Sequence, residues 1–214
     1  MRDLIKRLRT EWPSDSFDRL IAAAQSSGEP HESTHVERGT LLDTVQTGVV
    51  HVVHRGACRV EYRRTGLTLG IVHAPYVAGV LEAVNGDCGL VYECKAPSTA
   101  IAFTLDDWNA LIVRCDLWKD VAVVLAKYLE AISMRTAFLT ASSAYEIVCN
   151  ALHILDAHAP DLKRDLVAVS FVLERTKLSR SIVAKIISDL RAGGYLEIDR
   201  GRLIAITRPF PLRY

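Results

Sequence analysis

The spacing of the apolar residues changes near residue 104, and this change limits the possible folds more than any other feature of the chain. Between residues 36 and 103, short β-rich runs alternate with glycines and polar residues at intervals of roughly ten residues. Strands at this spacing are typical of an antiparallel sandwich or barrel. The runs predicted to form strands are Thr47–Val53, Cys58–Tyr62, Leu67–His73, Gly89–Glu93 and Thr99–Phe103.

Helical spacing replaces the strand pattern after Thr104, where Asp106 and Asp107 fall in the expected first turn of a helix. A long helix is predicted for residues 116–140, because its apolar residues recur at steps of four and three. A seam of this length either packs on the chain's own β-rich part or pairs with a second copy, and we favour the pairing. The residues expected at this dimer interface are Trp118, Ala122, Leu125, Leu129, Ile132 and Leu139.

Shorter signals mark the beginning of the chain and one turn within the β-rich part. Two short helices are predicted before residue 26, separated at Pro13, with Asp15 or Ser16 as the cap of the second. Asn85–Gly86 is interpreted as a tight turn, because both residues tolerate a positive φ.

The remaining signals complete the expected layout. Residues 144–157 are predicted to form a helix and residues 158–161 a linker-like turn. The fold class is therefore α+β, with an N-terminal antiparallel β-roll of the jelly-roll or cupin type. We expect helices and a sensor-like β-roll in residues 1–115, the dimerisation helix in 116–140 and a further domain in 141–214.

The composition excludes several classes of protein. Half of the 214 residues are hydrophobic, which is enough for a packed core and excludes wholesale disorder. No uninterrupted apolar run of about 18 residues occurs, so we expect no membrane-spanning helix. The first residues carry charges throughout and lack the apolar stretch of a secretory signal. The five cysteines, an odd number without a CxxC pair, favour reduced thiols and a cytoplasmic protein.

The net charge of +1 hides an uneven distribution. Residues 163–214 contain eleven Lys or Arg and five Asp or Glu, a net charge of +6, which leaves −5 for residues 1–162. A basic segment attracts nucleic acid, because Lys and Arg neutralise phosphates and release their counterions. A solvated basic surface without a partner is the alternative that charge alone leaves open.

Two helices separated by a short turn are predicted between residues 166 and 191. The segment Leu166–Leu173 is apolar enough for a buried helix or for a strand that leads into a helix, and residues 176–178 form a plausible turn. Ser179 is a favourable N-cap for the second helix, which runs from Arg180 to about Arg191. The apolar face expected for this second helix consists of Ile182, Val183, Ile186, Ile187 and Leu190.

A hairpin is predicted to follow this pair of helices. Gly193–Gly194 ends the second helix, since glycine accepts the left-handed conformation at a helix C-terminus. Residues 195–198 and 203–207 are interpreted as strands, joined by the basic turn 199–202. The order of helix, turn, helix and hairpin is that of a winged helix-turn-helix, so residues 141–214 are expected to form a DNA-binding domain.

The second helix carries the residue types that a DNA reader needs. A helix fits the major groove of DNA and reads base edges with residues near its N-terminal end. Arg180 is suited to bidentate bonding of guanine, and Ser181 and Lys185 to a base or a phosphate. Each also suits an ordinary solvated position, and Ser179 caps the helix whatever the function. The predicted DNA-binding residues are Lys177, Ser179, Arg180, Ser181, Lys185, Arg200 and Arg202.

The run from Ser179 to Ile186 resembles the recognition helix of the catabolite-activator/fumarate-nitrate-regulator superfamily of bacterial transcription factors. That pattern is Ser-Arg, two variable residues, Val, a small residue, a basic residue and Ile or Leu. The order of β-roll, long helix and winged helix resembles the same superfamily over nearly the whole chain. The resemblance implies a homodimer that reads a pseudo-palindromic site on double-stranded DNA, with one recognition helix in each of two successive major grooves.

The chain departs from the superfamily pattern at three positions of the predicted reader. Leu173 stands where a small residue is usual in the first helix, and Lys177 where the turn usually has a glycine. The second residue of the recognition helix is often acidic, whereas here it is Ser181. We therefore expect an operator sequence that differs from those read by superfamily members with the usual acidic residue.

The cyclic-nucleotide cassette of the superfamily is incomplete in this chain. Gly79 matches the start of the cassette, but Val80 stands where a glutamate would bind the ribose. From Leu81 to Ala102 the only basic residue is Lys95, and a buried cyclic phosphate without a cation is unfavourable. Binding of cyclic AMP is thus disfavoured, and the effector is a different one or none.

Other cofactors have weaker signals still. An iron–sulfur cluster resembling that of the superfamily would need N-terminal cysteines, whereas the first cysteine is Cys58. Haem stays open through His51, His54 and His73, although His51 and His54 are expected on opposite faces of a strand. We therefore predict no cofactor and no metal. The cysteines are either inert buried thiols or, if one has a lowered pKa, oxidant sensors; they are Cys58, Cys88, Cys94, Cys115 and Cys149.

Two classes of function remain for this chain. The favoured one is a dimeric transcription regulator, with RNA polymerase as a candidate further partner and no association with a membrane. The alternative is a small-molecule-binding or enzymatic β-roll whose helical tail binds protein. No catalytic triad, P-loop or GxGxxG motif occurs, so we expect no enzyme.

Overall fold

The computed structural model describes residues 13–27, 33–139, 143–158 and 160–211. The first of the two predicted N-terminal helices lies outside the described residues. The described chain divides into two compact units that adjoin in the sequence between Glu130 and Ala131, and we call them the N-terminal and the C-terminal unit. This division falls inside the long helix.

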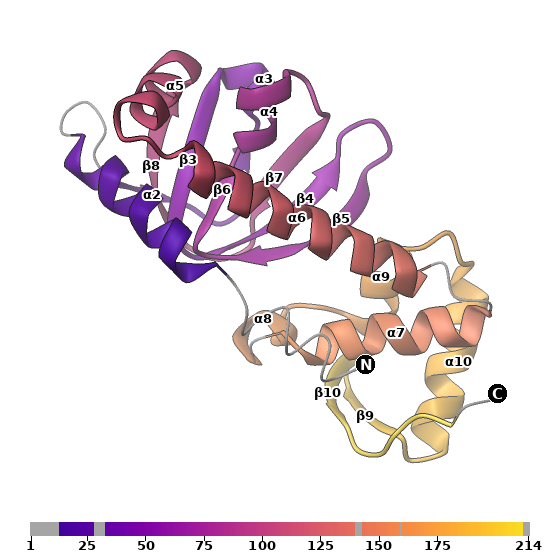
Figure 1. The fold of residues 1–214 in the computed structure, drawn as a ribbon. Helices are drawn as coiled ribbons and strands as arrows, with labels where there is room; N and C mark the ends of the chain where they lie inside the picture. Colours follow the sequence, from indigo (N-terminus) through magenta and orange to yellow (C-terminus); the bar gives the residue numbers. More distant parts are fainter. Residues whose placement is uncertain (1–12, 28–32, 140–142, 159, 212–214) are drawn as a thin grey trace. The chain divides into compact units, whose positions relative to one another are not determined.

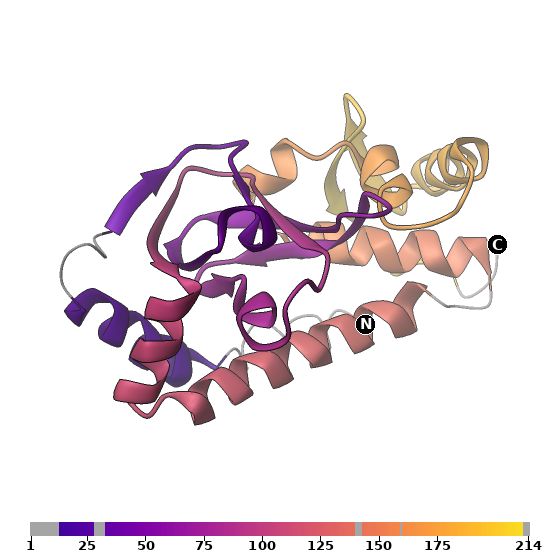
Figure 2. The same ribbon diagram turned by 90° about the horizontal axis from the view of Figure 1, so that it is seen from above.

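Two four-stranded antiparallel sheets form most of the N-terminal unit (Figures 1 and 2). The strands are β1 Ser33–Val36, β2 Leu41–Leu42, β3 Val49–Arg55, β4 Ala57–Tyr62, β5 Leu67–His73, β6 Tyr76–Ala78, β7 Leu90–Cys94 and β8 Ser98–Thr104. The first sheet has the order β1-β8-β3-β6 and the second the order β2-β7-β4-β5. We call the pair of sheets the β-roll.

One hydrophobic core lies between the two sheets, because alternate residues of each strand point inward. It combines side chains from both sheets: Leu42, Val53, Cys58, Val60, Tyr76, Ala78, Leu90, Tyr92, Cys94 and Ala100. The rings of Tyr76 and Tyr92 stack here with their centroids 6.4 Å apart. The interior of the β-roll is therefore filled largely by its own side chains.

A second core joins three helices to the first sheet. The helices are α2 Ser14–Ser26, α5 Leu105–Arg114 and the first part of α6 Trp118–Leu139; the shorter α3 Thr44–Thr47 and α4 Val80–Asn85 lie between strands. Trp108 of α5 is buried and meets the ring of Phe103 edge-on. Val50, Val52 and Ile101 contribute to this core, whereas Val53 and Ala100 contribute to the inner one. The period-2 alternation of the sequence thus divides β3, β6 and β8 between the two cores.

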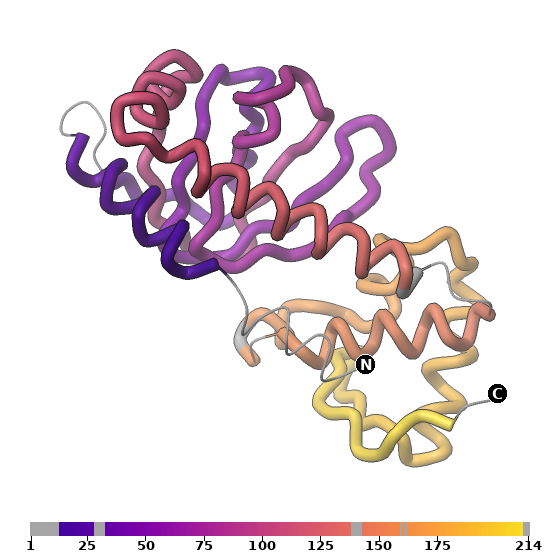
Figure 3. Tube along the Cα trace, viewed as in Figure 1, coloured from indigo at the N-terminus to yellow at the C-terminus, as the bar shows by residue number. Residues whose placement is uncertain are grey.

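The C-terminal unit is a small helical domain with a two-stranded hairpin. It contains α7 Ala144–Asp156, α8 Pro160–Arg164, α9 Ala168–Leu173, α10 Arg180–Ala192, β9 Leu196–Asp199 and β10 Arg202–Ile206. Its fully buried side chains include Val148, Leu152, Leu155, Phe171, Val183 and Leu203. Figure 3 follows the path of the chain through both units.

The α+β class is confirmed, with antiparallel sheets, a long helix and a C-terminal winged helix-turn-helix. The five predicted strands are present as β3, β4, β5, β7 and β8, with ends that shift by at most two residues. The prediction missed β1, β2 and β6, which have four, two and three residues. Runs that short contain too few alternations to be recognised.

Three local predictions were wrong. Asn85–Gly86 is not a strand-connecting turn, because Asn85 ends α4 and Gly86 caps it with φ 74°. Neither Asp15 nor Ser16 caps α2, which begins earlier, at Ser14, and has no side-chain cap. The predicted turn at 158–161 is interrupted by Pro160, which begins α8. Proline is favoured at a first helical position, where its missing N–H is not needed.

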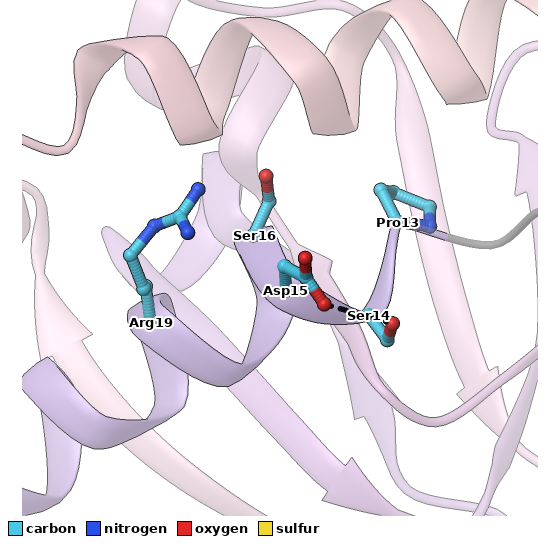
Figure 4. A pocket seen from close by; sticks show the side chains of 5 residues that line it. All are labelled: Pro13, Ser14, Asp15, Ser16 and Arg19. Carbon is cyan, nitrogen blue, oxygen red and sulfur yellow. Dashed lines mark hydrogen bonds between the residues drawn. The ribbon is translucent and has the colours of Figure 1, made fainter.

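The start of α2 borders a shallow hollow at the surface of the N-terminal unit (Figure 4). Its lining consists of Pro13, Ser14, Asp15, Ser16 and Arg19. The guanidinium of Arg19 is paired with Asp120 of α6 (Nε to Oδ1 3.0 Å), so the cation of the lining holds the two helices together. Within the described residues, every helix is too short or too polar to cross a lipid bilayer.

Candidate nucleic-acid interface

The helix α10 is held in the C-terminal unit by an apolar stripe. Val183, Ile186, Ile187 and Leu190 are buried, and α10 packs against α7, α9 and β9. Ile182, predicted on the same face, is 43% exposed because it lies at the edge of the stripe. The rest of the predicted apolar face is buried, and the opposite side of α10 therefore faces outward.

The N-terminal end of α10 is built as predicted around Ser179. This residue is extended (φ −73°, ψ 149°), and its Oγ accepts a hydrogen bond from the backbone N–H of Ile182 at 3.4 Å. The hydroxyl of Ser181 lies 3.0 Å from the same oxygen. The first turn holds no acidic residue, so the partial positive charge of the helix end and the charge of Arg180 add together.

The exposed side of α10 carries small residues and Lys185, and the acidic Asp189 follows further along the helix. Ser181, Lys185 and Ser188 follow one another at helical spacing and are all exposed, as is Ala184 between them. Small side chains allow the backbone of a helix to approach a partner closely. The single long side chain among these four residues, Lys185, lies about one turn from Ser181.

The C-terminal end of α10 is fixed by a Schellman motif. The N–H of Tyr195 donates to the carbonyl of Leu190, and that of Gly194 to Arg191, both at 2.9 Å. Gly194 has φ +69°, which a side chain would resist. Arg208 donates from Nε to the carbonyl of Gly194 at 3.1 Å, so this arginine serves the helix end.

The hairpin of β9 and β10 forms the wing. Asp199 pairs in register with Arg202, and the two residues between them, Arg200 and Gly201, have φ 45° and φ 80°. Two successive positive φ angles are those of a type I′ turn. The carbonyl of Gly201 accepts the N–H of Ala168 at 2.8 Å, which anchors the tip of the wing to the start of α9.

The turn between α9 and α10 contains one buried cation, Arg175, and one exposed cation, Lys177. Arg175 is buried, with its guanidinium 3.6 Å from the ring centroid of Phe171 and Nη1 donating to the Phe171 carbonyl at 3.0 Å. Arg135, in the last part of α6, donates to the carbonyl of Arg175 at 3.3 Å. Lys177, two residues further on, is exposed.

All seven predicted DNA-binding residues are exposed. The structure brings Ser179, Arg180, Ser181 and Lys185 together at the first turns of α10, with Lys177 two residues before the cap. Arg200 and Arg202 form a separate group on the wing, beside the start of α9. The basic tail also contains three cations that bind groups within their own unit, namely Arg175, Arg208 and Lys163. Lys163 Nζ, for example, lies 2.8 Å from Asp156 Oδ1. The sequence does not distinguish these structural cations from the predicted DNA-binding ones.

The predicted dimer seam is largely exposed along α6. Trp118, Leu129 and Ile132 are 45%, 66% and 41% exposed, and Ala122 is exposed as well. Leu125 is half-buried against the core beneath α6, so it offers only part of its surface. The side chain of Leu139 lies outside the described residues.

The segment that resembles the cyclic-nucleotide cassette, residues 74–82, contains no Lys or Arg. Val80 is buried in the core under the helices, and Lys95 Nζ is bound to Glu93 Oε1 at 2.6 Å. Glu82 is 95% buried, and burial raises the pKa of its carboxyl group. Surroundings that disfavour the charged form of a carboxyl group also disfavour a bound phosphate.

The three histidines considered for haem do not share one environment. His51 is half-buried, and loss of solvation lowers the pKa of its imidazole. His54 lies with its Nε2 3.1 Å from the hydroxyl of Ser33. His73 ends β5, in the other sheet.

Comparison with protein families and curated proteins agrees with this geometry. A family described as winged helix-turn-helix DNA binding matches residues 144–212, from α7 through the wing. A protein of Escherichia coli K12 named Inhibitor of hydrogen peroxide resistance is 24% identical over 197 residues, which cover 92% of this chain and 95% of that protein. The protein of the same name from Salmonella typhimurium is 27% identical over 174 residues, covering 80% of this chain and 79% of that protein.

Solved structures with the same fold are bacterial regulators. The c-di-GMP-responsive global regulator CLP of Xanthomonas campestris matches with a TM-score of 0.69 and 12% identity, over 91% of this chain and 100% of that one. A transcriptional regulator of the CRP/FNR family from Thermus thermophilus matches with a TM-score of 0.63 and 18% identity, over 82% and 94%. The chain therefore has the CRP/FNR fold, which confirms at the level of fold the resemblance seen in the sequence.

The cap of α10 gives a stability prediction. Ser179→Ala removes the acceptor for the Ile182 N–H and should lower the free energy of unfolding of the C-terminal unit by about 1 kcal/mol in urea denaturation. Ser188→Ala, on the exposed side of the same helix, is the control and should change it by less than about 0.5 kcal/mol. Equal stability of the two variants would show that this cap does not hold the start of α10.

Proposed function

We propose that this protein is a homodimeric transcription regulator of the catabolite-activator/fumarate-nitrate-regulator superfamily, and that α10 reads its operator. The observation that carries the proposal is the outward, acid-free N-terminal end of α10, with Arg180, Ser181 and Lys185 exposed on a helix whose other face is buried. The match of residues 144–212 to winged helix-turn-helix DNA-binding domains supports it.

The proposed mechanism follows from the chemistry of these side chains. In the major groove, the guanidinium of Arg180 can donate two hydrogen bonds to O6 and N7 of one guanine. Ser181, Ala184 and Ser188 leave room for the helix to approach the base edges. Lys177, Lys185 and the N–H groups at the start of α10 then contact phosphates, which fix the register of the helix on DNA.

The wing supplies a second, separate contact in this proposal. Arg200 and Arg202 are exposed, and the bond from Ala168 to Gly201 holds the tip of the hairpin in place. A rigid tip loses little conformational entropy when its arginines meet the DNA backbone or the minor groove. RNA polymerase is the partner through which a regulator of this kind would act.

The effector in this proposal is not a cyclic nucleotide. The raised pKa of Glu82 and the Lys95–Glu93 ion pair make the corresponding region unsuitable for a phosphate. The competing function, a β-roll protein whose tail binds another protein, predicts no retention of DNA in a gel shift at low salt. The DNA-binding proposal predicts retention that weakens steeply as the salt concentration rises.

Substitution of Arg180 tests the reading role of α10. Arg180→Ala should weaken operator binding by about 1–3 kcal/mol and relax the preference at one base pair, as measured by gel shift on selected operator variants. Arg191→Ala, an exposed arginine at the opposite end of α10, is the matched control and should have a smaller effect. An equal loss in both variants, with unchanged base preference, would mean that α10 contributes only general positive charge.

Substitution of the α6 seam tests the homodimer. Leu129→Glu places a charge on the exposed apolar seam and should convert the dimer to a monomer in light scattering coupled to gel filtration. Val113→Glu on α5 is a matched control, because Val113 and Leu129 are both 66% exposed. A dimer that survives Leu129→Glu places the interface elsewhere.

The name of the curated relatives suggests which genes the proposed regulator controls. Both relatives are named for hydrogen peroxide resistance and align with most of this chain. We extend the proposal to target genes that affect resistance to peroxide. Footprinting of the purified protein on genomic fragments should then enrich sites upstream of peroxide-degrading enzymes, whereas sites confined to unrelated genes would remove this part of the proposal.

A further inference from the structure

Two cysteines lie directly opposite each other on neighbouring strands inside the β-roll. Cys58 of β4 pairs in register with Cys94 of β7, and both side chains are fully buried. Their sulfur atoms are 3.3 Å apart, with the S–H of Cys58 placed to donate to Cys94. The sequence alone gave no reason to pair these two residues, since they are 36 positions apart.

The backbone geometry at this pair suits a disulfide. The N–H of Lys95 donates to the carbonyl of Ala57 at 2.8 Å, whereas the N–H and C=O of Cys94 bond to Thr40 and Gly39 on the other side. Cys58 and Cys94 are therefore a non-hydrogen-bonded pair, for which the Cα atoms lie about 4.5 Å apart. Disulfides span Cα distances of about 4.4–6.8 Å, so a bond forms here without a large backbone shift.

Two consecutive hydrogen bonds end at the sulfur of Cys94 and favour its thiolate form. The hydroxyl of Tyr76 donates to Cys58 Sγ at 2.6 Å, and Cys58 donates in turn to Cys94. The bond from Cys58, together with one from Ser98, lowers the pKa of the Cys94 thiol to about 7. The same contact raises the pKa of Cys58, so Cys94 loses its proton more readily than Cys58 does.

We propose that Cys58 and Cys94 form a dithiol site that a small hydroperoxide oxidises to a cross-strand disulfide. The Cys94 thiolate attacks one peroxide oxygen, and the O–O bond breaks to give a sulfenic acid on Cys94. The other oxygen leaves as hydroxide and takes up the proton that Cys94 had released. The sulfur of Cys58 then attacks the sulfur of Cys94, the S–O bond breaks, and the Cys58 proton leaves with the hydroxide as water. The two thiols lose two electrons and the peroxide gains them.

Cys94 is buried, so a small oxidant would reach it through local opening at the edge of the sheet. Cys94 is the last residue of β7, and the neighbouring strand β2 at this sheet edge has only two residues. Short edge strands open locally more easily than the centre of a sheet, and hydrogen peroxide is only slightly larger than water. This site lies in the β-roll and is independent of whether the C-terminal unit binds DNA.

Oxidation of the full chain with hydrogen peroxide tests the proposal without DNA. After alkylation of the remaining thiols under non-reducing conditions, mass spectrometry should find a species that lacks two hydrogens and a linked peptide pair containing Cys58 and Cys94. Because the pKa of the Cys94 thiol is lowered, the initial rate should rise with pH and level off at a lower pH than for an ordinary thiol. Circular dichroism at each time point confirms that the folded protein reacts.

Variants assign the two roles. Cys58→Ala should leave a sulfenic acid on Cys94 that dimedone traps, and Tyr76→Phe should slow formation of the disulfide. Cys115→Ala removes an exposed thiol and is the control that should leave the disulfide unchanged. Oxygen addition without the linked pair, a disulfide through Cys88 or Cys115, or linkage only in denaturant would overturn the proposal.

Discussion

The apolar stripe of α10 determines what the C-terminal unit can present to a partner. Val183, Ile186, Ile187 and Leu190 fix the rotation of the helix about its own axis by packing against α7, α9 and β9. With that rotation set, Ser181, Lys185 and Ser188 face outward as a consequence of helical geometry. The Ser179 cap and the Schellman motif at Gly194 then set where the helix begins and ends.

The fold could be predicted from the sequence where periodic patterns are long. The strands β3, β4, β5, β7 and β8 and the helix α6 were recognisable because each contains several repeats of its period. The strands β1, β2 and β6 were missed because pairing with longer neighbours, rather than their own pattern, defines them. Pro160 was misread because proline both breaks a helix and favours its first position.

The local structure of α10 was predicted well, whereas the DNA-binding roles of its residues stay a prediction. Residue type and spacing were sufficient to identify exposed positions at the start of a capped helix, and Ile182 failed only as the edge of its stripe. A count of charges could not tell the structural arginines Arg175 and Arg208 from the exposed Arg180. Arg175 lies over a ring and Arg208 binds a helix end, and neither contact is visible in the sequence. The Cys58–Cys94 pair depended on strand register, which no local pattern specifies.

The wing tip has a further consequence. Arg200 is held at φ 45°, a left-handed conformation that costs a residue with a side chain roughly 1–2 kcal/mol. A glycine at this position would relieve that strain and remove the guanidinium at the same time. If the wing meets DNA as proposed, thermal stability and affinity for DNA are opposed at this single residue, and selection for thermostability alone would tend to remove the cation.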